Sequence, residues 1–293
     1  MARPAAREEH NDGETGDRVD QGATAFVLIA AALMLVMTPG VAFFYGGLVR
    51  AKSAVSMIML GFGALALISV LWVMFGYAMV FAGAGSPGFL GLDGVFGIDL
   101  DLIGLDALVA DDSAAGAHVL ATAAFQAMFA VITVALISGA VADRARFGAW
   151  LVFAGIWATL VYFPVAGWIF NVSWGADGLA DGGWIVYGLE AVVGAGALDF
   201  AGGTAVHINA GAAALALALV LGKRVGFARG MSSPPHSIPF VLLGAALLWF
   251  GWFGFNAGSE GAADAEASLV VVNTLVAPAA ALLAWLVVEA VRG

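Results

Sequence analysis

The sequence predicts an all-α protein, built as a polytopic bundle of membrane-spanning helices. Hydrophobic residues make up 62% of the 293 residues and charged residues only 11%, whereas soluble domains carry about 25% charged residues. Seven apolar runs are each long enough to cross a bilayer, which takes about 20 residues of helix. Forty glycines favour close helix contacts in lipid, so we expect a tightly packed bundle.

The expected spans are separated by polar or charged loops and show no strand-like alternation, so we predict helices rather than outer-membrane strands. They run roughly over Thr24–Val49, Val55–Ala82, Leu120–Ala142, Trp150–Phe170, Gly202–Gly222, Ile238–Ala257 and Leu269–Val291. The first run is too long for the apolar part of a signal peptide. We therefore predict a disordered polar tail over residues 1–22 and a transmembrane domain over residues 23–293.

Basic residues between the spans fall on one side of the predicted membrane. They are Arg50 and Lys52, Arg144 and Arg146, and Lys223, Arg224 and Arg229. Because basic loops face the cytoplasm, we expect the N-terminus outside and the protein in the cell membrane.

Several classes of function are excluded by composition. The chain has no cysteine and four histidines, which argues against thiol catalysis, disulfides and metal sites, and we expect no metal or cofactor. A net charge of −10 argues against nucleic-acid binding. No glycine-rich phosphate loop precedes a lysine, and the seventh span has no lysine for a retinal Schiff base. We find no sign of an enzyme.

Two ionisable residues stand out near the fifth span. His207 is the only histidine inside a span, and ionisable groups at membrane depth are usually functional. It is either a neutral histidine bonded between helices or a group that passes a polar molecule or a proton along a pore. Asp199 is either an N-cap for the fifth span or a fixed negative charge that favours a cation at an outer mouth.

Aromatic residues gather in the third and sixth spans. Phe125 and Phe129 are four residues apart and share a helix face, and Trp249, Trp252, Phe253 and Phe255 precede Asn256 and Ser259 in the sixth span. Such stripes are usually packing surfaces, but aromatic faces also bind desolvated cations. The hydroxyl of Ser259 could accept a hydrogen bond from an N–H donor.

These residues resemble the ammonium transporter family, which includes the methylammonium permeases and Rh proteins. Five segments carry the resemblance in family order: Thr38–Arg50 (TPGVAFFYGGLVR), Phe125–Thr133 (FQAMFAVIT), Ala142–Phe147 (ADRARF), Asp199–Gly211 (DFAGGTAVHINAG) and Gly251–Ser259 (GWFGFNAGS). The likeness extends over everything after the tail and implies ammonium as the substrate.

The resemblance implies a role for each matched residue. Phe129 and Ser259 would form the outer ammonium-recruitment site, supported by the buried carboxylate of Asp199. Phe125 and Phe255 would be a stacked pair that gates the pore. His207 would be the first of two pore histidines. Trp252 would be a further pore residue, and Tyr45 would lie on an inner water path. A homotrimer and control by a cytoplasmic PII-type protein are further expectations.

The sequence departs from the family pattern in two ways. Many members have a tryptophan in the outer cage where Phe170 falls here, and Trp168 or Trp184 could substitute for it. Members also have eleven spans, built as two inverted five-span repeats and a last helix. This sequence covers the first repeat and two spans of the second, so the second pore histidine and the regulated tail are missing. We therefore expect a fragment, a truncated sequence or one product of a split gene, with poor folding or abnormal association.

Three functions remain open at this point. The chain could be an ammonium channel, which deprotonates ammonium and passes ammonia along a histidine-lined pore. It could be an ammonium sensor that binds without conducting. It could also be a membrane subunit that requires a second chain.

Overall fold

A computed structural model describes residues 21–82, 96–175, 178–188, 194, 196–224, 227 and 234–292, with the side chains of 173–182 and 187–188 left aside. The predicted tail falls outside the described residues as far as residue 20, and so does Arg229 of the predicted basic loops.

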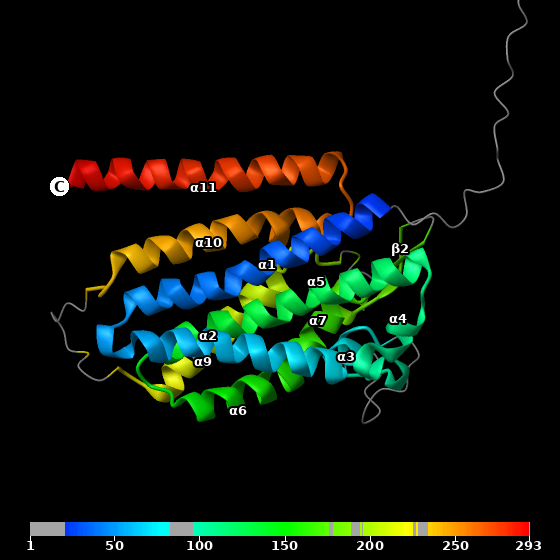
Figure 1. Ribbon diagram of the computed structural model, residues 1–293, viewed down its shortest axis with the longest axis horizontal. Helices are drawn as coiled ribbons and strands as arrows, with labels where there is room; N and C mark the ends of the chain where they lie inside the picture. The colour runs from blue at the N-terminus through cyan, green and yellow to red at the C-terminus, as the bar shows by residue number, and fades with distance from the viewer. Residues whose placement is uncertain are drawn as a thin grey trace, which may run out of the picture.

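The protein is a bundle of long helices, and seven of the described helical segments are long and apolar enough to cross a membrane (Figure 1). The predicted fold class is confirmed. The segments are Gln21–Leu48, Ala51–Val80, Ala114–Val141, Phe147–Phe170, Gly203–Leu221, Ile238–Glu260 and Ala265–Arg292. The third begins six residues before the predicted Leu120, because the Ser113 hydroxyl accepts a hydrogen bond from the Gly116 N–H and caps the helix.

Five of the seven spans change helix type along their length, while α1 and α11 are α-helical throughout. In chain order, the seven spans are composed of α1 (Gln21–Leu48); α2 (Ala51–Leu71), η1 (Trp72–Gly76) and α3 (Tyr77–Val80); α5 (Ala114–Ile137) and η4 (Ser138–Val141); α6 (Phe147–Trp157), η5 (Ala158–Tyr162) and α7 (Phe163–Phe170); η7 (Gly203–Ile208) and α9 (Asn209–Leu221); α10 (Ile238–Ala257) and η8 (Gly258–Glu260); and α11 (Ala265–Arg292). The turns η1, η5 and η7 are π-helical. Wide turns of this kind are rare and frequently occur at functional sites.

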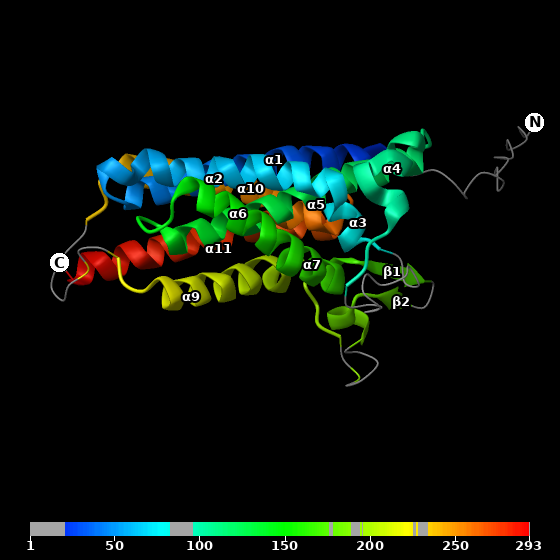
Figure 2. The ribbon, with the colours of Figure 1, turned by 90° about the horizontal axis from the view of Figure 1, so that it is seen from below.

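The connections contain short elements that the sequence analysis did not predict. They are η3 (Leu100–Leu105) and α4 (Asp106–Ala110) before the third span, then a hairpin of β1 (Val172–Gly175) and β2 (Gly178–Gly182), and η6 (Trp184–Gly188) after the fourth. The two strands are antiparallel. In Figure 2 the hairpin and α4 lie at the same end of the bundle.

The centre of the bundle is α1, which packs on α2, α5 and most extensively on α10. The contact with α10 depends on a glycine. A Cβ atom on Gly244 would lie 2.3 Å from the backbone nitrogen of Phe44 and 2.6 Å from the carbonyl oxygen of Gly40. Backbone atoms cannot move aside as a flexible side chain can, so only glycine permits this approach.

Three of the predicted basic loops meet at one end of the bundle. Asp143 is 4% exposed, forms an ion pair with Arg224 and lies 3.6 Å from Arg50, while Arg144 donates to the carbonyl of Gly222. Burial raises the pKa of the Asp143 carboxyl, but a hydrogen bond from Ser53 and the two guanidinium groups outweigh it, so the pKa is lowered. Charged groups thus bring the ends of five spans together.

The helices differ greatly in how far they are covered. In α5, 67% of the most apolar stretch is buried, against 6% in α11 and 17% in the span of η7 and α9. Figure 1 shows α11 at the edge of the bundle, beside α10. Within the described residues, α9, α10 and α11 therefore present a broad apolar flank.

Candidate functional site

Four of the predicted phenylalanines form one cluster, brought together from three spans. The ring of Phe129 lies 5.1 Å from that of Phe125, 5.6 Å from that of Phe170 and 4.6 Å from that of Phe255, between centroids. Phe129 is 1% exposed and Phe255 1%. The expected pair of Phe125 and Phe255 is therefore seen as a larger cluster, in which Phe129 supplies the contact with Phe255.

Phe170 occupies the position where the family pattern led us to expect tryptophan. Its ring meets Phe129 edge to face, at an interplanar angle of 63°. The ring of Trp168 instead packs on Trp184, at 5.4 Å between centroids. Phe170 is thus a ring from the end of the fourth span that contacts Phe129.

Ser259 lies one turn beyond Phe255, where α10 becomes η8. Its hydroxyl donates to the carbonyl of Phe255 at 2.8 Å, which leaves its oxygen able to accept a hydrogen bond. The preceding Gly258 permits the close approach here, because a Cβ atom on it would lie 2.7 Å from the ring of Phe125. The hydroxyl is thus tied to the helix that carries Phe255 and lies next to the aromatic cluster.

His207 stands on the π-helical turn η7 and faces α10. The backbone N–H groups of Val206 and His207 both donate to the carbonyl of Gly202, at 2.9 and 3.0 Å. The extra residue in this turn rotates His207 relative to the regular helix that follows. Its ring is parallel to that of Trp252, at 5.9 Å and 3°, and lies 5.8 Å from that of Phe255.

Asp199 holds the start of the same turn. Its carboxylate accepts the backbone N–H groups of Gly203, Thr204 and Ala205 at 2.7, 2.8 and 2.9 Å. The capping interpretation of this residue therefore has direct structural support. The negative charge also lies at the positive end of a helix, where a carboxylate is favoured.

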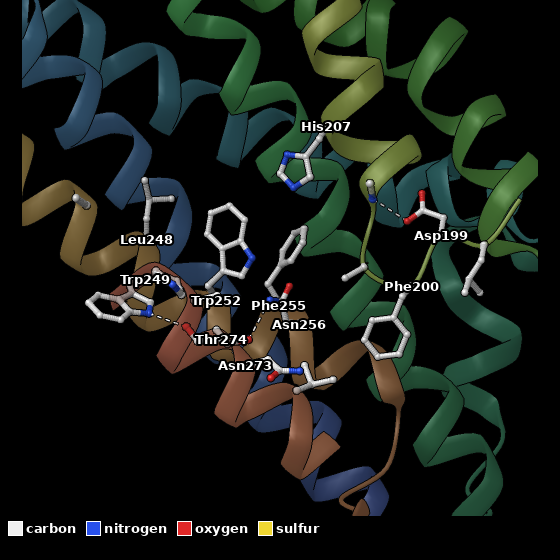
Figure 3. A pocket seen from close by; sticks show the side chains of 17 residues that line it. Asp199, Phe200, His207, Leu248, Trp249, Trp252, Phe255, Asn256, Asn273 and Thr274 are labelled. Atoms are coloured by element: carbon white, nitrogen blue, oxygen red, sulfur yellow. Dashed lines mark hydrogen bonds between the residues drawn. The ribbon is translucent and has the colours of Figure 1, made fainter. Parts of the chain in front are cut away.

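Asp199 and His207 border a cavity of about 810 Å³ between η7, α10 and α11, together with Trp252 and Phe255 (Figure 3). Its lining is mainly apolar and includes Asp199, His207, Trp249, Trp252, Phe255, Asn256, Asn273 and Thr274. Figure 3 shows His207 pointing toward Trp252 across the cavity, with Asn273 and Thr274 on the opposite wall. Such an apolar cavity with a few convergent polar groups is the usual form of a small-molecule site.

Of the predicted site residues, Asp199, His207, Trp252 and Phe255 line the cavity, whereas Phe125, Phe129, Phe170, Ser259 and Tyr45 do not. Tyr45 also lies apart from the aromatic cluster. It stands near the end of α1, and its hydroxyl donates to the carbonyl of Leu136 at 3.1 Å. It contributes nothing to the lining of the cavity.

Among the residues of the cavity that were not predicted from the sequence are two polar ones, Asn273 and Thr274 on α11. The signal was present, because they are adjacent polar residues in an otherwise apolar run, four and five residues before Pro278. Among the described residues, no group of three histidine, cysteine, aspartate or glutamate side chains could hold a metal ion.

Comparisons with known proteins agree on one family. The sequence profile described as Ammonium Transporter Family matches residues 25–293. An ammonium transporter of Mycobacterium tuberculosis is 53% identical over 291 residues, which cover 93% of this chain and 57% of that protein. An ammonium transporter of Bacillus subtilis is 45% identical over 271 residues, covering 92% and 60%.

Solved structures give the same answer. The crystal structure of Candida albicans Mep2 has a TM-score of 0.76 at 34% identity and covers 93% of this chain and 56% of that one. A structure described as a sensor Amt protein has a TM-score of 0.74 at 25% identity, covering 91% and 61%. The chain thus spans about three fifths of the length of these relatives.

Proposed function

The chain belongs to the ammonium transporter family, and on this premise we propose that it forms the first part of a path that carries ammonium across the membrane as ammonia. The observation that carries the proposal is the unbroken series of ring contacts from Phe129 through Phe255 to His207 and Trp252. It joins the proposed recruitment residues to the proposed pore residue in one structure.

Recruitment follows from the chemistry of the ammonium ion. Ammonium and potassium ions are similar in size, but ammonium donates hydrogen bonds and can lose a proton. The faces of Phe129 and Phe170 would attract the cation, at about 0.5–2 kcal/mol for each favourable ring contact. The oxygen of Ser259 would accept one N–H hydrogen bond. Asp199, held by three N–H groups, would add negative potential without contacting the ion.

Passage beyond this point requires loss of the proton. The buried rings of Phe125 and Phe255 offer no hydrogen bonds, so an intact cation would lose its hydration without compensation. Neutral ammonia crosses such a layer far more easily. A neutral imidazole at His207 can donate and accept hydrogen bonds, and it would receive ammonia below the rings while Trp252 supports it.

Orientation and partners are part of the same proposal. The meeting of Arg50, Asp143 and Arg224 at one end supports a cytoplasmic face there, with the N-terminus outside and Tyr45 on the inner side. We extend the proposal to the plasma membrane, to a homotrimer and to control by a PII-type protein on the basic face.

The relatives are longer than this chain, and we propose that helices beyond these seven contribute to a complete path. The test is uptake of radiolabelled methylammonium by cells that lack their own ammonium transporters. It compares the chain alone with the chain continued by the C-terminal part of the Mycobacterium tuberculosis relative. Uptake that falls in Phe129→Leu and Asp199→Ala, but not in the matched Phe240→Leu at the far end of α10, supports the recruitment site. Unchanged uptake kinetics in both site variants would refute the proposed recruitment site.

A sensing function is the second candidate, because one of the similar structures is described as a sensor Amt protein. A sensor would bind ammonium without net transport. Saturable binding of ammonium to the purified chain, together with background uptake in both forms, would favour sensing or a subunit that requires a second chain. Restored uptake on coexpression with the C-terminal part would then identify the subunit.

A further inference from the structure

The proline of α11 leaves one backbone carbonyl without its helical partner. Pro278 has no N–H group, and in a regular helix that group would donate to the carbonyl of residue 274. Within a membrane an unpaired carbonyl is costly. Here the indole N–H of Trp249, on the neighbouring α10, donates to the Thr274 carbonyl at 3.0 Å.

The side chain of the same threonine makes a second bond to α10. The amide of Asn256 donates to the Thr274 hydroxyl oxygen at 3.0 Å. Thr274 is 5% exposed, although most of α11 is exposed. Figure 3 shows both bonds as dashed lines that converge on Thr274 from two levels of α10.

The two donors lie on either side of Trp252 along one face of α10. Trp249 precedes it by three residues and Asn256 follows it by four, so all three side chains share a helix face and all three line the cavity. Because residues three and four apart on a helix are neighbours, fixing Trp249 and Asn256 would restrict the rotamers open to Trp252 between them. Its ring is parallel to that of His207 within 3°.

From this geometry we infer that Thr274 is a positioning residue for the pore wall. Its carbonyl and hydroxyl hold Trp249 and Asn256, and these two side chains keep Trp252 stacked on His207. The assignment of this wall to a pore rests on the proposed function. The contacts of Thr274 with Trp249 and Asn256 do not, and they can be tested without measuring transport.

The first test is the NMR signal of the His207 ring in the purified chain, where a parallel indole shifts the imidazole protons by its ring current. The chain has four histidines, so the signal can be assigned with His207→Gln. We expect Thr274→Val, which removes only the hydroxyl, to move the His207 signal toward its position in Trp252→Phe. Thr274→Ser should leave it unchanged.

Thr159→Val is the matched control, because the Thr159 hydroxyl bonds only to the Gly155 carbonyl of its own helix. A His207 signal that moves in Trp252→Phe but stays in place in Thr274→Val would overturn the inference. A signal that moves equally in Thr159→Val would overturn it as well.

The second test concerns the freed carbonyl and is read from thermal unfolding in detergent. Trp249→Phe keeps the aromatic volume but removes the donor, so the midpoint should fall. Adding Pro278→Ala restores a helical N–H group for the Thr274 carbonyl, and the double variant should recover most of the loss. A double variant no more stable than Trp249→Phe would refute the role assigned to the freed carbonyl.

Discussion

Replacement of Asp199 by alanine tests how His207 is held in place. The carboxylate accepts three consecutive backbone N–H groups at the start of η7, and His207 stands on that turn. Alanine removes both carboxylate oxygens, and with them all three hydrogen bonds, but leaves the backbone able to adopt the same path. The expected result is local opening of residues 203–207 rather than global unfolding.

The size of the effect follows from the exposure of the three donors. The N–H of Gly203 is exposed, whereas those of Thr204 and Ala205 are partly buried, so water can replace the carboxylate at the first donor. Each remaining donor that loses its acceptor costs about 1–3 kcal/mol. Because the two sites are only partly buried, we take roughly 2–4 kcal/mol for the pair. This corresponds to amide exchange faster by roughly 30-fold to roughly 700-fold, at about 1.4 kcal/mol per tenfold.

The assay is hydrogen–deuterium exchange with mass spectrometry on peptides that cover residues 203–207. Asp264→Ala is a matched control, because Asp264 accepts the N–H of Ala267 at the start of α11 in the same manner. It should speed exchange in its own turn and leave residues 203–207 unchanged. Exchange in residues 203–207 that is equally slow in Asp199→Ala and in the unmodified chain would refute the capping argument.

Three further predictions concern packing, charge and the aromatic cluster. Gly244→Ala should destabilise the bundle by roughly 1–3 kcal/mol through overpacking against α1, seen as a lower unfolding midpoint, while Gly211→Ala, which meets no atom within 4 Å, should not. Asp143→Asn should lower the midpoint at pH 7. Because folding lowers the pKa of Asp143, its stabilisation is present above the usual carboxyl pKa and is lost as the pH falls through the lower folded pKa. The difference in midpoint between Asp143→Asn and the unmodified chain should therefore shrink as the pH is lowered below the usual carboxyl range. A difference that stays constant would contradict this account. Phe129→Ala should cost roughly 3–5 kcal/mol by opening a buried cavity, and an unchanged midpoint would mean that the ring cluster is not packed as described.

The helical class and the seven spans could be predicted from the sequence alone, and four predicted site residues, Asp199, His207, Trp252 and Phe255, line the cavity. A bilayer requires each span to be apolar over about 20 consecutive residues, and that requirement can be read locally. An ionisable residue within a span can be recognised in the sequence in the same way, since the residues around His207 are mainly apolar. The resemblance then assigned expected roles to Phe129, Phe255 and Ser259 by position alone.

How these residues meet depends on the packing of the helices and could not be predicted from the sequence. The contact of Phe129 with Phe255 joins positions far apart in the chain, and it depends on the approach of α10 to α1 and α5. The π-helical turn under His207 was not predictable, because a shift of one hydrogen bond depends on the packing around it. Thr274 was missed for the same reason. Asn273 and Thr274 stand out as polar residues in an apolar run, but neither sequence segment alone tells which helix they face. The Thr274 carbonyl matters because Pro278 frees it and Trp249, on another helix, supplies the donor.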